Sequence, residues 1–63
     1  MRVTVNGDPR ETREGAVVAD LLPADCRGSA AAVNGAVVPR ARLTETLLRE
    51  GDVVEIVTAV QGG

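Results

Sequence analysis

The residues with the clearest chemical potential are the last three, Gln61, Gly62 and Gly63. An α-carboxylate at Gly63 is ionised at neutral pH and stays unreactive until another group makes it electrophilic. Because glycine has no Cβ, Gly62 and Gly63 present a narrow profile and adopt extended or positive-φ shapes freely. Beyond Val60, three residues reach roughly 10 Å when extended. The pattern therefore predicts a flexible tail over residues 61–63 that can enter a deep site on a partner.

The rest of the chain lacks the residue types of an active site. It has no histidine and a single cysteine, Cys26, so it can form neither an internal disulfide nor a zinc or iron–sulfur site of its own. It also has no glycine-rich phosphate loop and no credible nucleophile–base pair. We interpret Cys26 as an incidental small residue in a loop, with a reactive thiol as the alternative. We expect a protein that is not an enzyme and needs no cofactor.

Composition narrows the class of partner and the compartment. The chain of 63 residues has seven basic and nine acidic residues, a net charge of −2, and no Phe, Tyr or Trp. With no basic face and no aromatic stacking group, we expect no nucleic-acid partner. The apolar runs are too short to cross a bilayer and the N-terminus lacks a signal-peptide layout, so we expect no membrane partner and a cytoplasmic protein. This length predicts one domain, residues 1–63.

Two Asn-Gly pairs predict two hairpins. Residues 1–5 alternate in side-chain type as a half-buried strand does, and Asn6-Gly7 follows them. Both residue types tolerate the positive φ that tight hairpins need, so residues 10–14 are predicted to form the polar return strand at an edge. Residues 30–33 and 36–38 repeat the pattern around Asn34-Gly35, and Pro39 limits the second arm.

The remaining elements predict an α+β roll. Val17, Val18, Leu21 and Leu22 form the apolar stripe of a short helix that ends at Leu22, because Pro23 disfavours helical geometry there. A helical-turn connection carrying Leu43, Leu47 and Leu48 follows and closes at Gly51. Residues 52–60 form the clearest strand. We expect a mixed sheet on one helix, with the first and last strands central.

Alternation along the last strand predicts a candidate docking surface. Val54 and Ile56 fall on one face, and Val53, Glu55 and Val57 on the other. If the first pair faces the helix, Val53 and Val57 form an apolar stripe on the outer face, flanking Glu55. The alternative is that Val53 and Val57 are isolated surface valines, and that Glu55 is a charged residue that interrupts an otherwise apolar, aggregation-prone strand.

The whole chain resembles the ubiquitin-like β-grasp sulfur carriers of the thiamine-biosynthesis ThiS family. The resemblance rests on "VNGAVVPR" at 33–40, "EGDVVEIVTAV" at 50–60 and the terminal Gly62-Gly63. Leu43 stands where the family often has an aromatic residue, and Ala16 where it often has threonine. The resemblance implies a mixed four- to five-stranded β-grasp sheet packed on one short helix.

The resemblance also implies a function for the tail. A ThiF-like adenylating enzyme would join Gly63 to AMP, a sulfur donor enzyme would displace AMP to leave a thiocarboxylate, and thiazole synthase would take the sulfur. Gln61 and Gly62 would let the tail enter the partner's site. Arg40, in the family-like Pro-Arg pair, is a candidate partner contact, with a solvated loop arginine as the alternative.

Two other functions stay open. A carrier of the same fold can serve another acceptor, as the molybdopterin synthase small subunit or carriers of thio-natural-product pathways do. A β-grasp interaction module that never acquires sulfur is the third reading. It predicts that the tail can be deleted without loss of function.

Overall fold

The first hairpin forms around Asn6-Gly7, as the sequence predicts. In the computed structural model, which describes residues 1–22 and 29–58, β1 (Arg2–Val5) pairs with β2 (Asp8–Glu11) in antiparallel register. Asn6 and Gly7 have φ angles of 50° and 86°, the signs that a twisted two-residue turn requires. The return strand thus begins directly after the turn, with Asp8 opposite Val5. The predicted bounds of 10–14 are too late along the chain.

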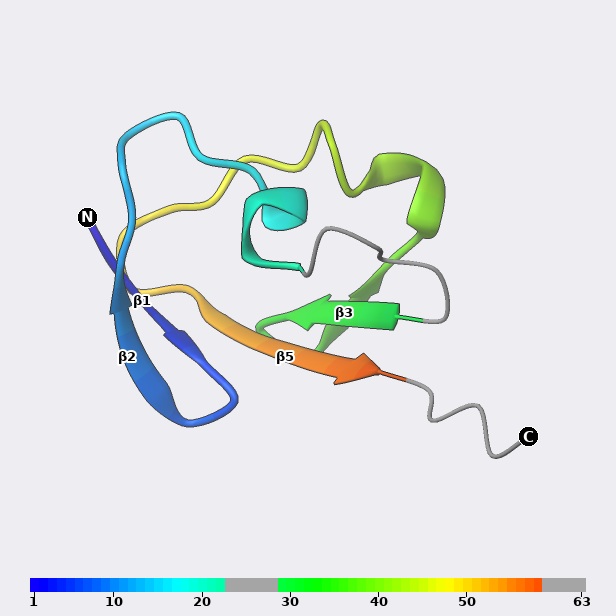
Figure 1. Ribbon diagram of the computed structural model, residues 1–63, viewed down its shortest axis with the longest axis horizontal. Coiled ribbons are helices and arrows are strands. Elements are labelled where there is room, and N and C mark those ends of the chain that lie inside the picture. The colour runs from blue at the N-terminus through cyan, green and yellow to red at the C-terminus, as the bar shows by residue number, and fades with distance from the viewer. Residues whose placement is uncertain (23–28, 59–63) are drawn as a thin grey trace.

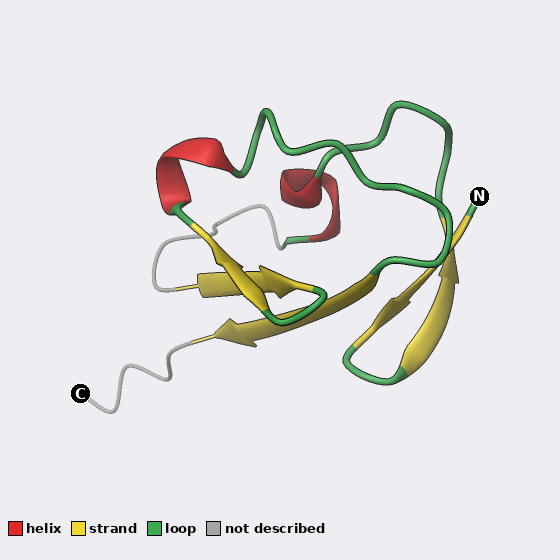
Figure 2. Cartoon of the chain, turned by 180° about the vertical axis from the view of Figure 1, so that it is seen from behind, coloured by secondary structure: helices red, strands yellow, loops and turns green. Residues whose placement is uncertain are grey.

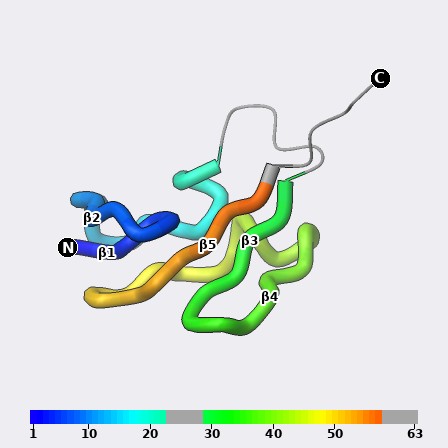
Figure 3. Tube along the Cα trace, turned by 90° about the horizontal axis from the view of Figure 1, so that it is seen from below, coloured from blue at the N-terminus to red at the C-terminus, as the bar shows by residue number. Residues whose placement is uncertain are grey.

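A second hairpin and the last strand complete one mixed sheet. β3 (Ser29–Val33) and β4 (Ala36–Val38) flank Asn34-Gly35, and β5 (Val53–Thr58) is the final strand. The five strands lie in the order β2-β1-β5-β3-β4, which Figure 3 shows side by side. β5 runs parallel to β1 and antiparallel to β3. The prediction of interior first and last strands and of a polar edge strand is confirmed.

The apolar core lies between the sheet and a layer of short turns and loops (Figure 1). Val3 and Val54 on the sheet and Val18 above it are the largest fully buried side chains. The other core members are Val5, Ala16, Ala31, Leu43 and Leu48. Two of these core residues, Ala16 and Leu43, are the positions at which this sequence differs from the residue types common in the family it resembles. A core this small, without aromatic rings, has little area to lose.

The predicted helix is a single 3₁₀ turn, η1 (Val18–Leu21), which ends one residue earlier than the predicted end at Leu22. Its start is capped from within, because the Val17 N–H donates to Asp20 Oδ2 at 2.9 Å. A second 3₁₀ turn, η2 (Arg40–Arg42), follows β4, and both turns lie on the same side of the sheet (Figure 2). No helix in the described part of the chain is long and apolar enough to cross a membrane.

The connection from η2 to β5 buries Leu43 and Leu48 but leaves Leu47 61% exposed. Its main chain runs beside the segment before η1: Val18 N–H donates to the Thr46 oxygen, and Leu48 N–H donates to the Ala16 oxygen, each at 2.9 Å. Leu47 lies between these two bonds and bridges Val17 in an isolated antiparallel pair. Extended backbone turns alternate side chains to opposite sides, which explains why Leu47 faces solvent.

Candidate functional site

β5 is the last element that the structure describes, and it leads toward the predicted tail. It is the central strand of the sheet and ends at Thr58. Gln61, Gly62 and Gly63 lie outside the described residues, as does Cys26. The folded part of the candidate site is therefore the region of the sheet that surrounds β5.

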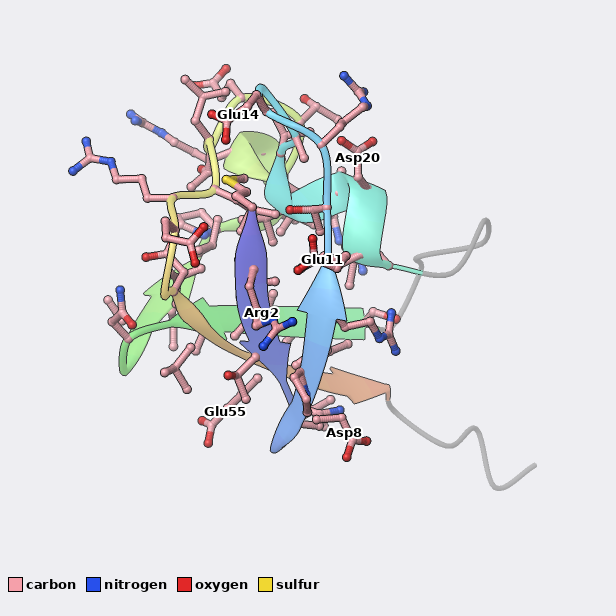
Figure 4. The ribbon with its side chains drawn as sticks, turned by 90° about the vertical axis from the view of Figure 1, so that its left-hand side faces the viewer. Arg2, Asp8, Glu11, Glu14, Asp20 and Glu55 are labelled. Carbon is pink, nitrogen blue, oxygen red and sulfur yellow. The ribbon has the colours of Figure 1, made fainter. Side chains whose placement is uncertain are left out.

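The two faces of β5 are as predicted. Val54 is fully buried and Ile56 is half-buried against the core. Val53 and Val57 are 48% and 66% exposed, and Glu55 between them is exposed too. Figure 4 shows Glu55 pointing away from the sheet on the side opposite to Asp20 of η1. We refer to the sheet side that carries Val53, Glu55 and Val57 as the outer face.

A groove of about 140 Å³ lies on the outer face. Ala32 stands opposite Val37 on one side and Glu55 on the other, and Ala30 stands opposite Val57. The short alanine side chains on β3 thus lie between the larger side chains of β4 and β5, which leaves a hollow along β3. The groove is lined by Ala30, Ala31, Ala32, Val37, Glu55 and Val57. Glu55 is the one charged residue among these six.

Sequence reasoning missed Ala30, Ala32 and Val37 as part of this surface. Val37 is 75% exposed, the highest value among the large apolar residues that are described as exposed. The Asn34-Gly35 turn sets the register that places Val37 beside Ala32. The sequence of the second hairpin therefore indicates that Val37 and Ala32 are neighbours. That these residues lie on the same surface as Val57 follows only from the pairing of β3 with β5.

Arg40 is not brought together with Val53 and Val57. It is the first residue of η2, it is exposed, and it does not line the groove. η2 lies on the side of the sheet that also holds η1 (Figure 2), whereas Val53 and Val57 are on the outer face. Any contact that Arg40 makes with a partner is thus separate from the groove.

A second cavity, of about 340 Å³, lies between β2 and η1. Its charged lining is balanced, with two arginines and two carboxylates. Arg13 and Asp20 approach each other to 3.6 Å as a largely solvent-exposed ion pair. The lining residues are Arg10, Glu11, Thr12, Arg13, Ala16, Asp20 and Leu21. The balance gives no preference for an anion or a cation, and none of these residues belongs to β5.

Within residues 1–22 and 29–58, no cluster of three or more His, Cys, Asp or Glu residues could hold a metal ion. What the described part offers is a surface: an apolar groove beside the strand that leads to the chain's last residues.

Comparison with known proteins gives a family and a fold. A model of the ThiS family matches residues 3–63. The crystal structure of a thiamine biosynthesis protein (ThiS) from Geobacter metallireducens is 32% identical, with a TM-score of 0.81 over 100% of both chains. The NMR structure of a thiamine biosynthesis protein from the same organism is also 32% identical, with a TM-score of 0.78, covering 100% of this chain and 88% of that one. No curated protein sequence matches the chain.

Proposed function

The chain belongs to the ThiS family, and from this premise we propose that it carries sulfur as a thiocarboxylate on Gly63. Membership of the family implies a non-catalytic sulfur carrier of thiamine biosynthesis whose partners are enzymes of that route. The observation that carries the finer proposal is the family match, which continues past β5 and through Gly62-Gly63. The proposal also places the protein in the cytoplasm, beside those enzymes.

The chemistry at Gly63 needs two steps, both performed by partners. A ThiF-like adenylating enzyme joins a carboxylate oxygen of Gly63 to the α-phosphorus of ATP and releases pyrophosphate. A sulfur donor enzyme then supplies sulfur at the oxidation level of hydrosulfide, which attacks the carbonyl carbon: a carbon–sulfur bond forms, the carbon–oxygen bond to AMP breaks, and a thiocarboxylate remains on Gly63. The thiocarboxylate passes its sulfur to thiazole synthase. Activation is required because the free carboxylate is a poor electrophile.

In this proposal, the partner enzymes recognise the protein through the surface of its folded domain. Val53 and Val57 are exposed on the outer face, and Val57 lies beside the groove. Burial of exposed valines against a partner removes apolar surface from water, at about 25 cal/mol per Å². We assign the outer face around Val57 to docking of the adenylating enzyme. Arg40 lies on the other side of the sheet (Figure 2). We assign it a peripheral contact that changes the rate of association with the partner more than the affinity.

The number of residues between Val57 and Gly63 limits how far the partner's catalytic centre can lie from the docking face. Val57 and Gly63 are six residues apart (63 − 57). Six residues span at most about 20 Å when fully extended. A partner that binds the outer face can thus hold its catalytic centre up to this distance from Val57. Gln61 and Gly62 are assigned to the entry path, where the absence of a side chain at Gly62 leaves room beside the adenylate.

The test is deletion of Gly63, with pyrophosphate exchange measured in the presence of an adenylating enzyme. We expect exchange to be lost and the circular dichroism spectrum to be retained, because Val54, the last buried core residue in the described part of the chain, lies nine positions before Gly63 (63 − 54). Leu47→Gln, which changes an exposed residue outside both the tail and the outer face, is the control and should support exchange. A truncated chain that still supports exchange would contradict the proposal.

A further inference from the structure

The side chain of Asn6 continues the pairing of β1 with β5 beyond the point where their main chains part. The parallel register runs through Thr4↔Val53 and Val5↔Val54. The Asn6 N–H then donates to the Val54 oxygen at 2.9 Å, and the chain reverses at Gly7. The last residue pair between β1 and β5, Val5↔Val54, therefore lies two positions before Ile56.

The Asn6 carboxamide takes up both main-chain groups of Ile56. Asn6 Oδ1 accepts from the Ile56 N–H at 2.8 Å, and Asn6 Nδ2 donates to the Ile56 oxygen at 3.1 Å. A carboxamide offers the same donor and acceptor as a peptide group. The Asn6 side chain thus acts as one additional residue in the hydrogen-bond ladder between β1 and β5. Asn6 itself has a positive φ of 50°, which asparagine adopts more readily than most residues.

Asn34 makes a related contact at the other end of β5. Its Oδ1 accepts from the Val53 N–H at 3.0 Å, and its own N–H donates to the Val53 oxygen at 2.7 Å. The two hairpin turns therefore fasten β5 at its first residue and at Ile56. Val57, the groove residue nearest the end of β5, follows Ile56 directly.

We propose that Asn6 is a positioning residue for docking, which holds the Val57 end of the outer face through Ile56. The inference rests on the proposed function, because docking is what the fixed strand serves. Without the carboxamide, the main chain of β5 beyond Val54 is paired with β3 alone, through the pairs from Ala32↔Glu55 to Ser29↔Thr58. A strand end that is held on one side must be ordered when a partner binds, which lowers affinity. Chemistry at Gly63 after docking is unchanged.

Asn6→Gly isolates the carboxamide, since glycine keeps the positive φ while the two hydrogen bonds are lost. Asn34→Gly is the control, because it also removes two carboxamide hydrogen bonds, but at the opposite end of β5, where they join Asn34 to the Val53 N–H and to Asp52 Oδ1. We expect amide hydrogen exchange at Ile56 to accelerate about tenfold in Asn6→Gly and to be unchanged in Asn34→Gly. With the adenylating enzyme, KM for the Asn6→Gly chain should rise about three- to tenfold at constant kcat.

A global loss of stability accelerates exchange at the other protected amides of the sheet as much as at Ile56, whereas loss of the carboxamide accelerates exchange at Ile56 selectively. If circular dichroism shows about 95% of Asn6→Gly folded, unfolding changes the apparent KM by only about 5%. Unchanged exchange at Ile56, or faster exchange with an unchanged KM, would overturn the positioning role and leave sulfur carriage intact. A wild-type chain that the adenylating enzyme does not accept would overturn the proposed function itself, and this inference with it.

Discussion

Val54 and Val57 lie three positions apart on β5 and face opposite sides of the sheet: Val54 is fully buried, whereas Val57 is 66% exposed. One strand thus carries a residue of the core and a residue of the proposed docking face. The same kind of substitution at the two positions should therefore affect different properties of the protein.

Val54→Ala should lower the free energy of unfolding by about 2 kcal/mol, because it removes two buried methyl groups from a site with no exposure. A domain of 63 residues has roughly 3–9 kcal/mol in total at about 0.05–0.15 kcal/mol per residue, so this loss is large. Urea unfolding followed by circular dichroism measures it. A shift of the midpoint no larger than that of an exposed substitution would show that Val54 is not packed as described.

Val57→Thr should leave stability nearly unchanged, because threonine keeps the branched shape that strands favour and the site is exposed. The hydroxyl group that replaces one methyl group should raise KM for the adenylating enzyme several-fold, which corresponds to about 1 kcal/mol of binding free energy. Leu47→Gln is the matched control. Leu47 is 61% exposed in the connection on the core side of the sheet, so its change should not affect KM. Equal effects of both variants would contradict docking on the outer face.

Gly35→Ala should lower the free energy of unfolding by about 1 kcal/mol. Gly35 has φ of 86°, and a Cβ added there would meet no heavy atom within 4 Å, so the cost comes from backbone conformation alone. Gly35→Asn should cost less, because asparagine adopts positive φ more readily than alanine. Urea midpoints of the two variants test the ranking. An alanine variant as stable as the asparagine variant would contradict the turn geometry.

Local patterns predicted the parts of the fold that depend on neighbours in sequence. Asn6-Gly7 and Asn34-Gly35 form the two tight turns, and alternation along β5 separates Val54 from Val57 correctly. The bounds of β2 were wrong because a two-residue turn pairs Asp8 directly with Val5. Thr12 still exchanges main-chain hydrogen bonds with Met1, and Arg13 and Glu14 then lead toward η1.

The parts that depend on distant contacts could not be predicted from local patterns. The cap of η1 comes from Asp20 within the turn, although the sequence offers no capping residue at Ala16. The groove needs β3 to lie between β4 and β5, which no single segment encodes. The bonds from Asn6 to Ile56 join residues 50 positions apart.

The intact mass of the Cys26→Ser chain, isolated from cells that contain the partner enzymes, tests sulfur carriage by Gly63 most directly. The substitution removes the thiol, so a persulfide on Cys26 cannot account for added sulfur. We expect a population heavier by the replacement of one oxygen with sulfur, located on Gly63 by fragmentation and absent when Gly63 is deleted. A single unmodified mass, or a chain that continues past Gly63 without trimming, would contradict the account.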